Sequence, residues 1–275
     1  DDLKGMLAYS TVSHLGFLTM LFGFGTPMAA VVGVFHIINH ATFKAALFMN
    51  AGIVDHETGT RDVKQLGGLV TLMPIAATLA VLAGLSMAGI PPLNGFISKE
   101  MMLEEASHTV WWGQPWLVPV LATLGATFSV AYAFRYIVHV YFGKRRDDYP
   151  KAPHDPPVGL WGPAAVLVAL VVAIGLFPAV IAGPVVEQVS RTVIGGDTPC
   201  FSLSLWHGIT PALFMSVAAI GLGVALLSAY RPIAAVWHGL RLPDAKTMFD
   251  RSVDRAAVAA VTFTRIIQNG SLERY

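Results

Sequence analysis

The chain has 275 residues, of which 55% are hydrophobic and only 13% are charged, and its formal net charge is +1. A soluble domain carries about a quarter of its residues as charged ones, and the mean hydropathy here is +0.61. These values exclude an ordinary soluble domain and give no indication of nucleic-acid binding. The single cysteine, Cys200, excludes a disulfide framework, a zinc cluster and an iron–sulfur site within this chain.

Apolar segments of about the length that crosses a membrane follow one another along the chain. They predict an all-α, multi-pass membrane domain over residues 1–231, with about six spans at 3–22, 29–54, 70–107, 117–142, 159–182 and 208–230. The first apolar segment begins almost at Asp1, and we expect the chain to be a piece of a longer protein.

Basic residues gather in alternate loops between these segments. One set of loops holds Lys4, Arg61, Lys64, Lys144, Arg145, Arg146, Lys151, Arg231 and Arg241, whereas the other set holds only Arg191. The positive-inside rule makes the first set cytoplasmic. Six crossings then place both ends of the chain on the cytoplasmic side.

The third apolar segment, 70–107, is too long for one straight span. It contains GIPPLNG, where Pro91 and Pro92 lack backbone donors and Gly95 permits a bend. We predict two half-helices, about 70–88 and 95–107, because broken helices in ion transporters line hydrated cavities. A proline kink with only a packing role is the alternative.

The residues from 243 to 269 have a different character. Apolar positions recur there every three or four residues, and charged side chains lie mostly on the other side. This pattern predicts an amphipathic surface or linker helix and not a further span.

The run FHIINHATFK places His36, His40 and Lys44 four residues apart. In a helix, each four-residue step turns the side chain by only about 40° from its predecessor, so the three groups form one narrow stripe. Ionisable groups are costly in a membrane and usually mark an ion or proton path. We therefore predict a proton relay through this stripe; a structural Lys44 in a buried ion pair is the alternative.

Several other polar residues could support such a relay. Lys99 follows the predicted helix break, but it could instead share a solvated rim cluster with Glu104 and its neighbours. His14 lies in the middle of a span. It could be hydrated and support the relay, but a histidine packed between helices is an equally good interpretation. Lys4, taken alone, is an interfacial anchor. We find no phosphate-binding glycine loop, nucleophile elbow or metal-spaced His/Cys set, so we expect neither a metal, nor a cofactor, nor a bond-making enzyme.

Three segments resemble a known family: LKGMLAYSTVSHLG, FHIINHATFKAALFMNAGIVDHETGTRD and LSMAGIPPLNGFISKE. They are similar to the second half of the antiporter-like proton-translocating subunits that respiratory complex I and the multisubunit Mrp-type cation/proton antiporters share. The likeness runs through residues 2–107; beyond them it rests on span order and the terminal QNGSLERY. Within the family, the loop DHETGTRDVKQLGGL resembles that of the large A-type subunit of Mrp antiporters.

The resemblance implies a fold of two inverted five-helix repeats, of which this chain holds most of the second. It places the family's relay histidines at His36 and His40 and its relay lysines at Lys44, Lys99 and Lys4. It further implies a monovalent cation (Na⁺)/H⁺ antiporter subunit in a bacterial plasma (inner) membrane, with other subunits of the complex as partners. Two alternatives stay open: a proton-pumping subunit of an NADH-dehydrogenase-type complex, and a structural membrane scaffold whose charges merely pair.

Overall fold

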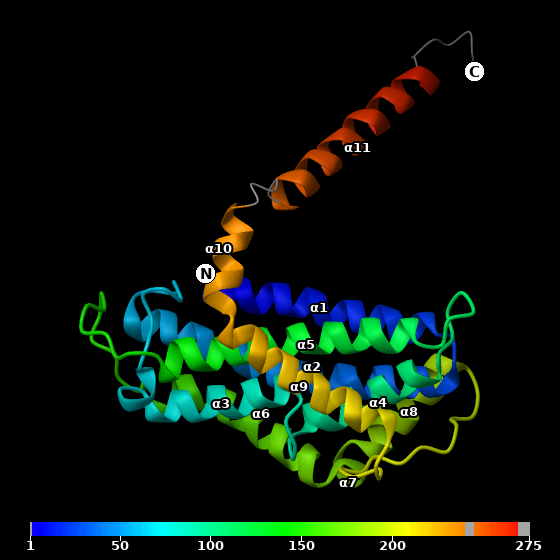
Figure 1. Cartoon of the computed structure of the whole chain (residues 1–275), viewed down its shortest axis with the longest axis horizontal. Coiled ribbons are helices and arrows are strands. Elements are labelled where there is room, and N and C mark those ends of the chain that lie inside the picture. Colours follow the sequence, from blue (N-terminus) through cyan, green and yellow to red (C-terminus); the bar gives the residue numbers. More distant parts are fainter. Residues whose placement is uncertain (1, 240–244, 269–275) are drawn as a thin grey trace. The chain divides into compact units, whose positions relative to one another are not determined.

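The computed structural model describes residues 2–239 and 245–268 of the chain, and within them it contains helices and only isolated β-bridges (Figure 1). The helices divide into two compact units, the first ending at Ser228 and the second beginning at Ala229. In the first unit the long helices run side by side in Figure 1. Among the described residues of this unit, five helical segments are long and apolar enough to cross a membrane: α1 (Leu3–Gly23), α2 (Pro27–Thr58), Leu117–Phe142, α6 (Val158–Leu176) and α9 (Pro211–Ser228).

Helix α2 is the central element, since it packs against α1, α3, α4, α6 and α8. Its start is fixed by Thr26, whose Oγ1 accepts a hydrogen bond from the backbone N–H of Ala29 at 3.0 Å, and by Pro27 in the first turn. Its end is fixed by Gly59, which adopts the left-handed conformation with φ of 75°. The helix therefore extends beyond both ends of the expected span, 29–54.

The segment predicted to be broken consists of two helices, α3 (Pro74–Ala88) and α4 (Asn94–His108). A short 3₁₀ turn, η1 (Leu69–Thr71), precedes them. Helix α3 ends at Gly89, which has φ of 84° and so terminates the helix in the left-handed region. Pro91 and Pro92 lie in the connection, as the sequence indicates.

Two later segments differ from the expected boundaries. Helix α5 (Leu117–Ile137) continues as a π-helical turn, η2 (Val138–Phe142). The two elements together cover the expected span, 117–142. Helix α6 ends at Leu176, six residues before the expected end, because Phe177 precedes a proline and leaves the helical conformation. Pro178 then begins a separate short helix, α7 (Pro178–Ile181).

A helix lies where the sequence analysis expects only a loop. Helix α8 (Gly183–Ile194) is amphipathic: Val185, Val189 and Val193 recur every four residues, whereas Glu187 and Arg191 lie on another face. Its length is far below that of a span, and a search for spanning segments therefore misses it.

The second unit contains α10 (Tyr230–Gly239) and α11 (Ala245–Ile267). Helix α11 corresponds to the expected amphipathic helix at 243–269, of which 243, 244 and 269 lie outside the described residues. Its apolar side chains, among them Phe249, Val253 and Phe263, are exposed in this unit.

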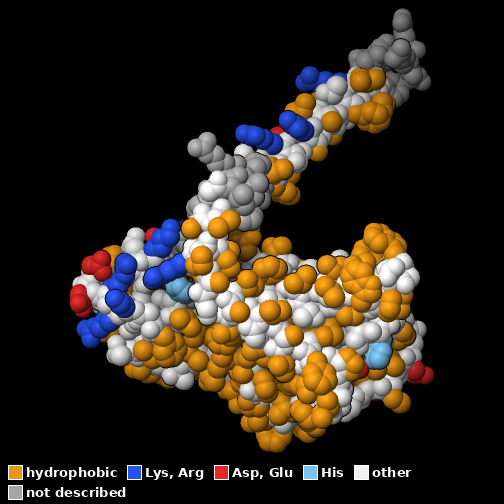
Figure 2. Space-filling view, viewed as in Figure 1, with side chains coloured by type: hydrophobic (Ala, Val, Ile, Leu, Met, Phe, Trp, Pro, Cys, Tyr) orange, Lys and Arg blue, Asp and Glu red, His pale blue; other side chains and the backbone are white. Residues whose placement is uncertain are grey.

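Apolar side chains cover the visible face of the first unit, and Lys and Arg gather near one end of it (Figure 2). The exposed basic residues of the loops there include Arg61, Lys64, Lys144 and Arg145. An apolar girdle with charges at the ends is the surface that a bilayer requires. The chain is thus part of a multi-pass, all-α membrane protein.

Candidate functional site

Two lysines are buried among the helices of the first unit. Lys44 of α2 is 5% exposed, and its Nζ donates to Ser10 Oγ at 2.6 Å and contacts Met87 Sδ at 3.2 Å. Lys99 of α4 is 7% exposed, and its Nζ donates to Ser129 Oγ at 2.7 Å and to the Ala88 carbonyl at 3.2 Å. Within the described part of the chain, neither ammonium lies within 4.0 Å of a carboxylate. The alternative, a buried ion pair at Lys44, therefore lacks a carboxylate partner among the described residues.

Three histidines form a cluster next to these lysines. His14 Nδ1 lies 3.0 Å from His36 Nε2, and both residues are fully buried. The ring centroid of His40 lies 5.0 Å from the ring centroid of His14 and 6.1 Å from that of His36. His14 Nε2 and His40 Nε2 are buried without a hydrogen-bond partner among the described residues. Imidazoles in such contact can accept and release protons through either nitrogen.

The histidine cluster reaches α4 through a serine. His36 Nδ1 lies 3.1 Å from Ser98 Oγ, and Ser98 directly precedes Lys99. Tyr132 of α5 donates to Ser129 Oγ at 2.9 Å, which is the same oxygen that accepts from Lys99. Side chains from α1, α2, α4 and α5 thus form one buried polar region.

The break between α3 and α4 is held by hydrogen bonds between these two helices and to α2. Ser86 Oγ donates to Asn94 Oδ1 at 2.6 Å and accepts from the backbone N–H of Gly95 at 3.1 Å. Asn94 Nδ2 donates to Asn39 Oδ1 at 3.0 Å, and Asn39 Nδ2 donates to the Asn94 carbonyl at 3.3 Å. A Cβ added at Gly95 would lie 1.9 Å from the Ser86 carbonyl oxygen, so only glycine fits this approach. These bonds satisfy polar groups that a membrane-embedded break would otherwise expose.

Comparison with known proteins relates part of this chain to a family. Residues 1–128 match the family described as the transmembrane region of NADH:quinone oxidoreductase and Mrp antiporters. These residues, slightly less than half of the chain, are similar to that family. They contain α1, the histidine cluster, both buried lysines and the broken helix.

Longer alignments extend the likeness beyond residue 128. The A/B-type subunit of a probable K⁺/H⁺ antiporter of Rhizobium meliloti (strain 1021) is 46% identical over 91% of this chain and 26% of its own length. The A1-type subunit of a Na⁺/H⁺ antiporter of Staphylococcus haemolyticus (strain JCSC1435) is 42% identical over 82% of this chain and 31% of its own length. The chain thus spans about a quarter to a third of the relatives that it matches.

A solved structure shows the same fold. A chain of the Mrp complex from Dietzia sp. DQ12-45-1b superposes with a TM-score of 0.82 and is 35% identical, with 100% of this chain and 29% of that chain covered. The antiporter-like fold therefore accounts for the whole arrangement of helices around the site.

Two predicted site residues of this antiporter-like segment lie apart from the buried cluster. Lys4 Nζ donates to Asp55 Oδ2 at 2.7 Å in a partly exposed ion pair. Glu104 pairs with His108 Nε2 at 3.0 Å near the end of α4, where both side chains are at least 36% exposed. The structure places Lys99 in the buried region, away from a solvated cluster of this kind.

The sequence does not predict several polar residues of the site, which contact a buried lysine, one of its partners or a histidine, or hold the break. These are Ser10, Asn39, Ser86, Asn94, Ser98, Ser129 and Tyr132. Their signal is a polar residue inside an apolar segment, which is weak because serine and asparagine also serve ordinary helix packing in membranes.

A cavity of about 450 Å³ lies between α1 and α5 and is lined by Ser10, Ser13, Tyr132 and Arg135, among others. It therefore touches Ser10, which accepts from Lys44, and Tyr132, which donates to the oxygen that accepts from Lys99. Water in this cavity could approach the partners of both lysines.

Proposed function

We propose that this segment conducts protons in the A-type subunit of a multisubunit monovalent cation/proton antiporter. His36, His40 and Lys44 carry protons through the middle of the membrane to Lys99, with His14 as a further member of the histidine cluster. The observation that carries the proposal is the pair of buried lysines, without carboxylate partners among the described residues, that contact the end of α3 at the break. Ionisable groups buried in this way are retained in membranes for ion or proton movement.

Electrostatic coupling would connect the steps. An ammonium that loses its proton changes the field at the next titratable group, and the groups of a buried cluster therefore titrate together. Proton movement along this line would drive cation export in the complete complex. Lys4 would exchange protons with the cytoplasmic side through its contact with Asp55.

The complete protein would contain a first inverted repeat before this second one. We place it in a bacterial plasma membrane, with both ends of this segment in the cytoplasm, because the basic loops alternate along the chain. Its partners would be the other subunits of the antiporter complex. We propose Na⁺ as the transported cation. The names of the relatives include both a K⁺/H⁺ and a Na⁺/H⁺ antiporter subunit.

A proton-pumping subunit of an NADH-dehydrogenase-type complex is a second candidate, because the matched family includes both kinds of protein. The two candidates share the relay and differ in what drives it. The antiporter is favoured by the 46% and 42% identity to antiporter subunits of the A/B and A1 types.

The experiment uses inverted membrane vesicles from an antiporter-deficient host that carries the full parent complex. A pH difference is imposed, and its collapse is followed after Na⁺, K⁺ or Li⁺ is added. Collapse that depends on one of these cations establishes exchange and names the ion. No collapse with any cation, together with proton pumping on addition of NADH, would overturn the antiporter proposal in favour of the redox-driven pump.

A further inference from the structure

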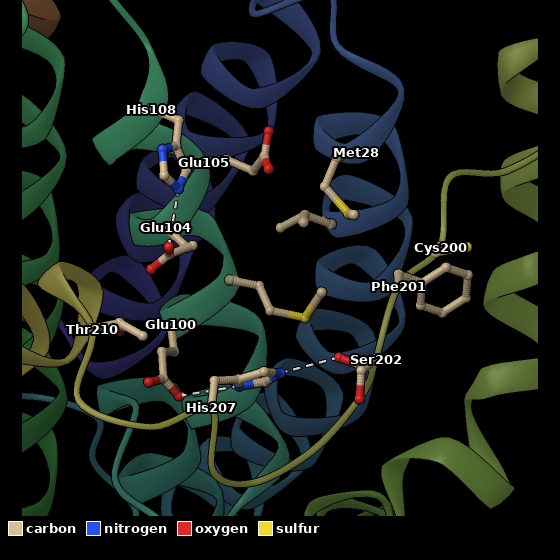
Figure 3. Close-up of a pocket in the computed structure, with 12 residues that line it drawn as sticks. Met28, Glu100, Glu104, Glu105, His108, Cys200, Phe201, Ser202, His207 and Thr210 are labelled. Atoms are coloured by element: carbon tan, nitrogen blue, oxygen red, sulfur yellow. Dashed lines mark hydrogen bonds and ion pairs between the residues drawn. The ribbon is translucent and has the colours of Figure 1, made fainter.

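A second cavity lies at the end of α4 away from the break (Figure 3). Its volume is about 340 Å³, and its walls come from α2, α4 and the connection between α8 and α9. Its ionisable lining residues are Glu100, Glu104, Glu105, His108, Cys200 and His207. No lysine or arginine is among its lining residues in the described ranges.

Glu100 is the unusual member of this lining. It is 3% exposed, and neither of its carboxylate oxygens has a hydrogen-bond partner among the described residues. It directly follows Lys99 in α4. An ionised carboxylate is costly to bury without hydrogen bonds, so the site requires a proton, a bridging water or a neighbouring positive charge.

His207 supplies a neighbour that can carry such a charge. Its Nδ1 lies 3.9 Å from Glu100 Oε2, and its Nε2 lies 3.1 Å from the Ser202 carbonyl (Figure 3). Nε2 also lies 3.1 Å from Ser204 Oγ, and in the tautomer that donates from Nε2 to the Ser202 carbonyl, Nδ1 faces the carboxyl group. The distance of 3.9 Å is longer than a direct hydrogen bond and suits a contact through one water.

The other ionisable groups around the cavity have their own partners or lie farther out. Glu104 pairs with His108, and Glu105 accepts from Thr26 Oγ1 at 3.0 Å. On α8, Glu187 pairs with Arg191 at 3.1 Å. The helices α2 and α9 contribute no charged residue to the lining. His207 is therefore the group placed to set the protonation of Glu100 from the side of the loop.

We propose that Glu100 and His207 form a proton-exchange site between α4 and the loop that precedes α9. Glu100 takes up and releases protons at the cavity, and His207 controls access to the carboxyl group from its place on the loop. The site rests on the proposed function above, and it is the exit or entry point on the face opposite the basic loops.

Two readouts test this site in vesicles that contain the full complex. The first is the reaction of dicyclohexylcarbodiimide, which labels protonated carboxyl groups in apolar surroundings, with mass spectrometry to locate the adduct. We expect labelling of Glu100 that increases as the pH falls. His207→Ala should raise the labelling rate at neutral pH by roughly threefold or more, because loss of a neighbour that can carry a positive charge favours the neutral carboxyl. His207→Gln keeps the donor to Ser202 and should give the same change.

The second readout is the cation-driven collapse of the pH difference at matched assembly. We expect Glu100→Gln to slow it about tenfold or more, as for loss of an essential transfer group, and Glu100→Asp to retain part of the rate. Glu187→Gln, which changes an exposed and paired glutamate, should leave it unchanged.

The outcomes separate this proposal from the proposed function. Wild-type exchange that is lost in Lys44→Ala but kept in Glu100→Gln would reject this site alone. Labelling that is absent at every pH, or equal in wild type and His207→Ala, would also reject it. Protection of Glu100 by Na⁺ or K⁺ at constant pH would make this a cation site and overturn the proposal. Absence of exchange in wild type would reject the proposed function, whereas the labelling would still decide whether the site exists.

Discussion

Lys44 and Lys99 contact consecutive residues at the end of α3: Lys44 Nζ lies 3.2 Å from Met87 Sδ, and Lys99 Nζ donates to the Ala88 carbonyl at 3.2 Å. One lysine comes from the central helix and the other from the second half of the broken helix. A small displacement of the last turn of α3 would thus change the surroundings of both ammonium groups. Discontinuous helices provide such movable ends in many transporters.

The contact between His14 and His36 predicts coupled behaviour of the two residues. His14→Gln and His36→Gln should each slow cation-driven proton exchange by about tenfold or more, and the double variant should be little worse than either one, because residues that act as a unit are not additive. The measurement is the initial rate of pH-difference collapse in vesicles at equal assembly. If the fold-reductions in rate of the two single variants multiply in the double variant, the two imidazoles act independently.

Close approach at the helix break predicts a strong effect of Gly95→Ala. The added Cβ would lie 1.9 Å from the Ser86 carbonyl oxygen, so the backbone must move, at a cost of about 1–3 kcal/mol or more. We expect a lower melting temperature of the purified complex and poorer assembly. Gly52→Ala on α2, which meets no atom within 4 Å, should be neutral or slightly stabilising. Equal effects of the two substitutions would contradict the geometry of the break.

The hydrogen bonds of Asn94 predict that its amide stabilises the break. Asn94→Leu leaves the Asn39 side-chain oxygen without its donor and the Ser86 hydroxyl without its acceptor, and each buried unsatisfied group costs about 1–3 kcal/mol. The melting temperature of the complex should therefore fall clearly. Thr78→Ala, which removes an exposed hydroxyl bonded only to the Pro74 carbonyl, is the matched control and should change it little. An Asn94→Leu complex as stable as the control would show that these bonds do not hold the break.

The partly exposed ion pair of Lys4 and Asp55 predicts that Lys4 contributes little to stability but more to transport. Such pairs contribute about 0–1 kcal/mol, so Lys4→Ala should hardly change the melting temperature. If Lys4 lies on the proton path, the same variant should still slow exchange severalfold, and Lys4→Arg should not restore it, because a guanidinium does not release its proton. Unchanged exchange in Lys4→Ala would limit Lys4 to its role as an interfacial anchor.

Much of the fold follows from local features of the sequence. The apolar segments are long enough to predict α1, α2, α5 and α9, and the prolines and glycines of GIPPLNG predict the break between α3 and α4. The early end of α6 could also have been predicted, since Pro178 disfavours the helical conformation at Phe177. Helix α8 is harder to predict, because twelve residues with an apolar face resemble many loop segments.

The candidate site is only partly predictable from one sequence. The four-residue spacing of His36, His40 and Lys44 is a property of one helix and can be derived from helical geometry. The contact of His14 with His36 joins two helices, and their packing decides it. The same holds for His207 and Glu100, which the connection between α8 and α9 brings together and which sequence spacing cannot predict.

The proposed role of Lys44 in carrying protons is tested by comparing two lysine variants of the full complex in inverted vesicles. Lys44→Ala removes the buried ammonium, and Lys64→Ala removes an exposed one on a loop. At matched assembly, cation-driven collapse of the pH difference should be lost in Lys44→Ala and kept in Lys64→Ala. Collapse at the wild-type rate in an assembled Lys44→Ala complex would contradict the relay and would favour a structural scaffold.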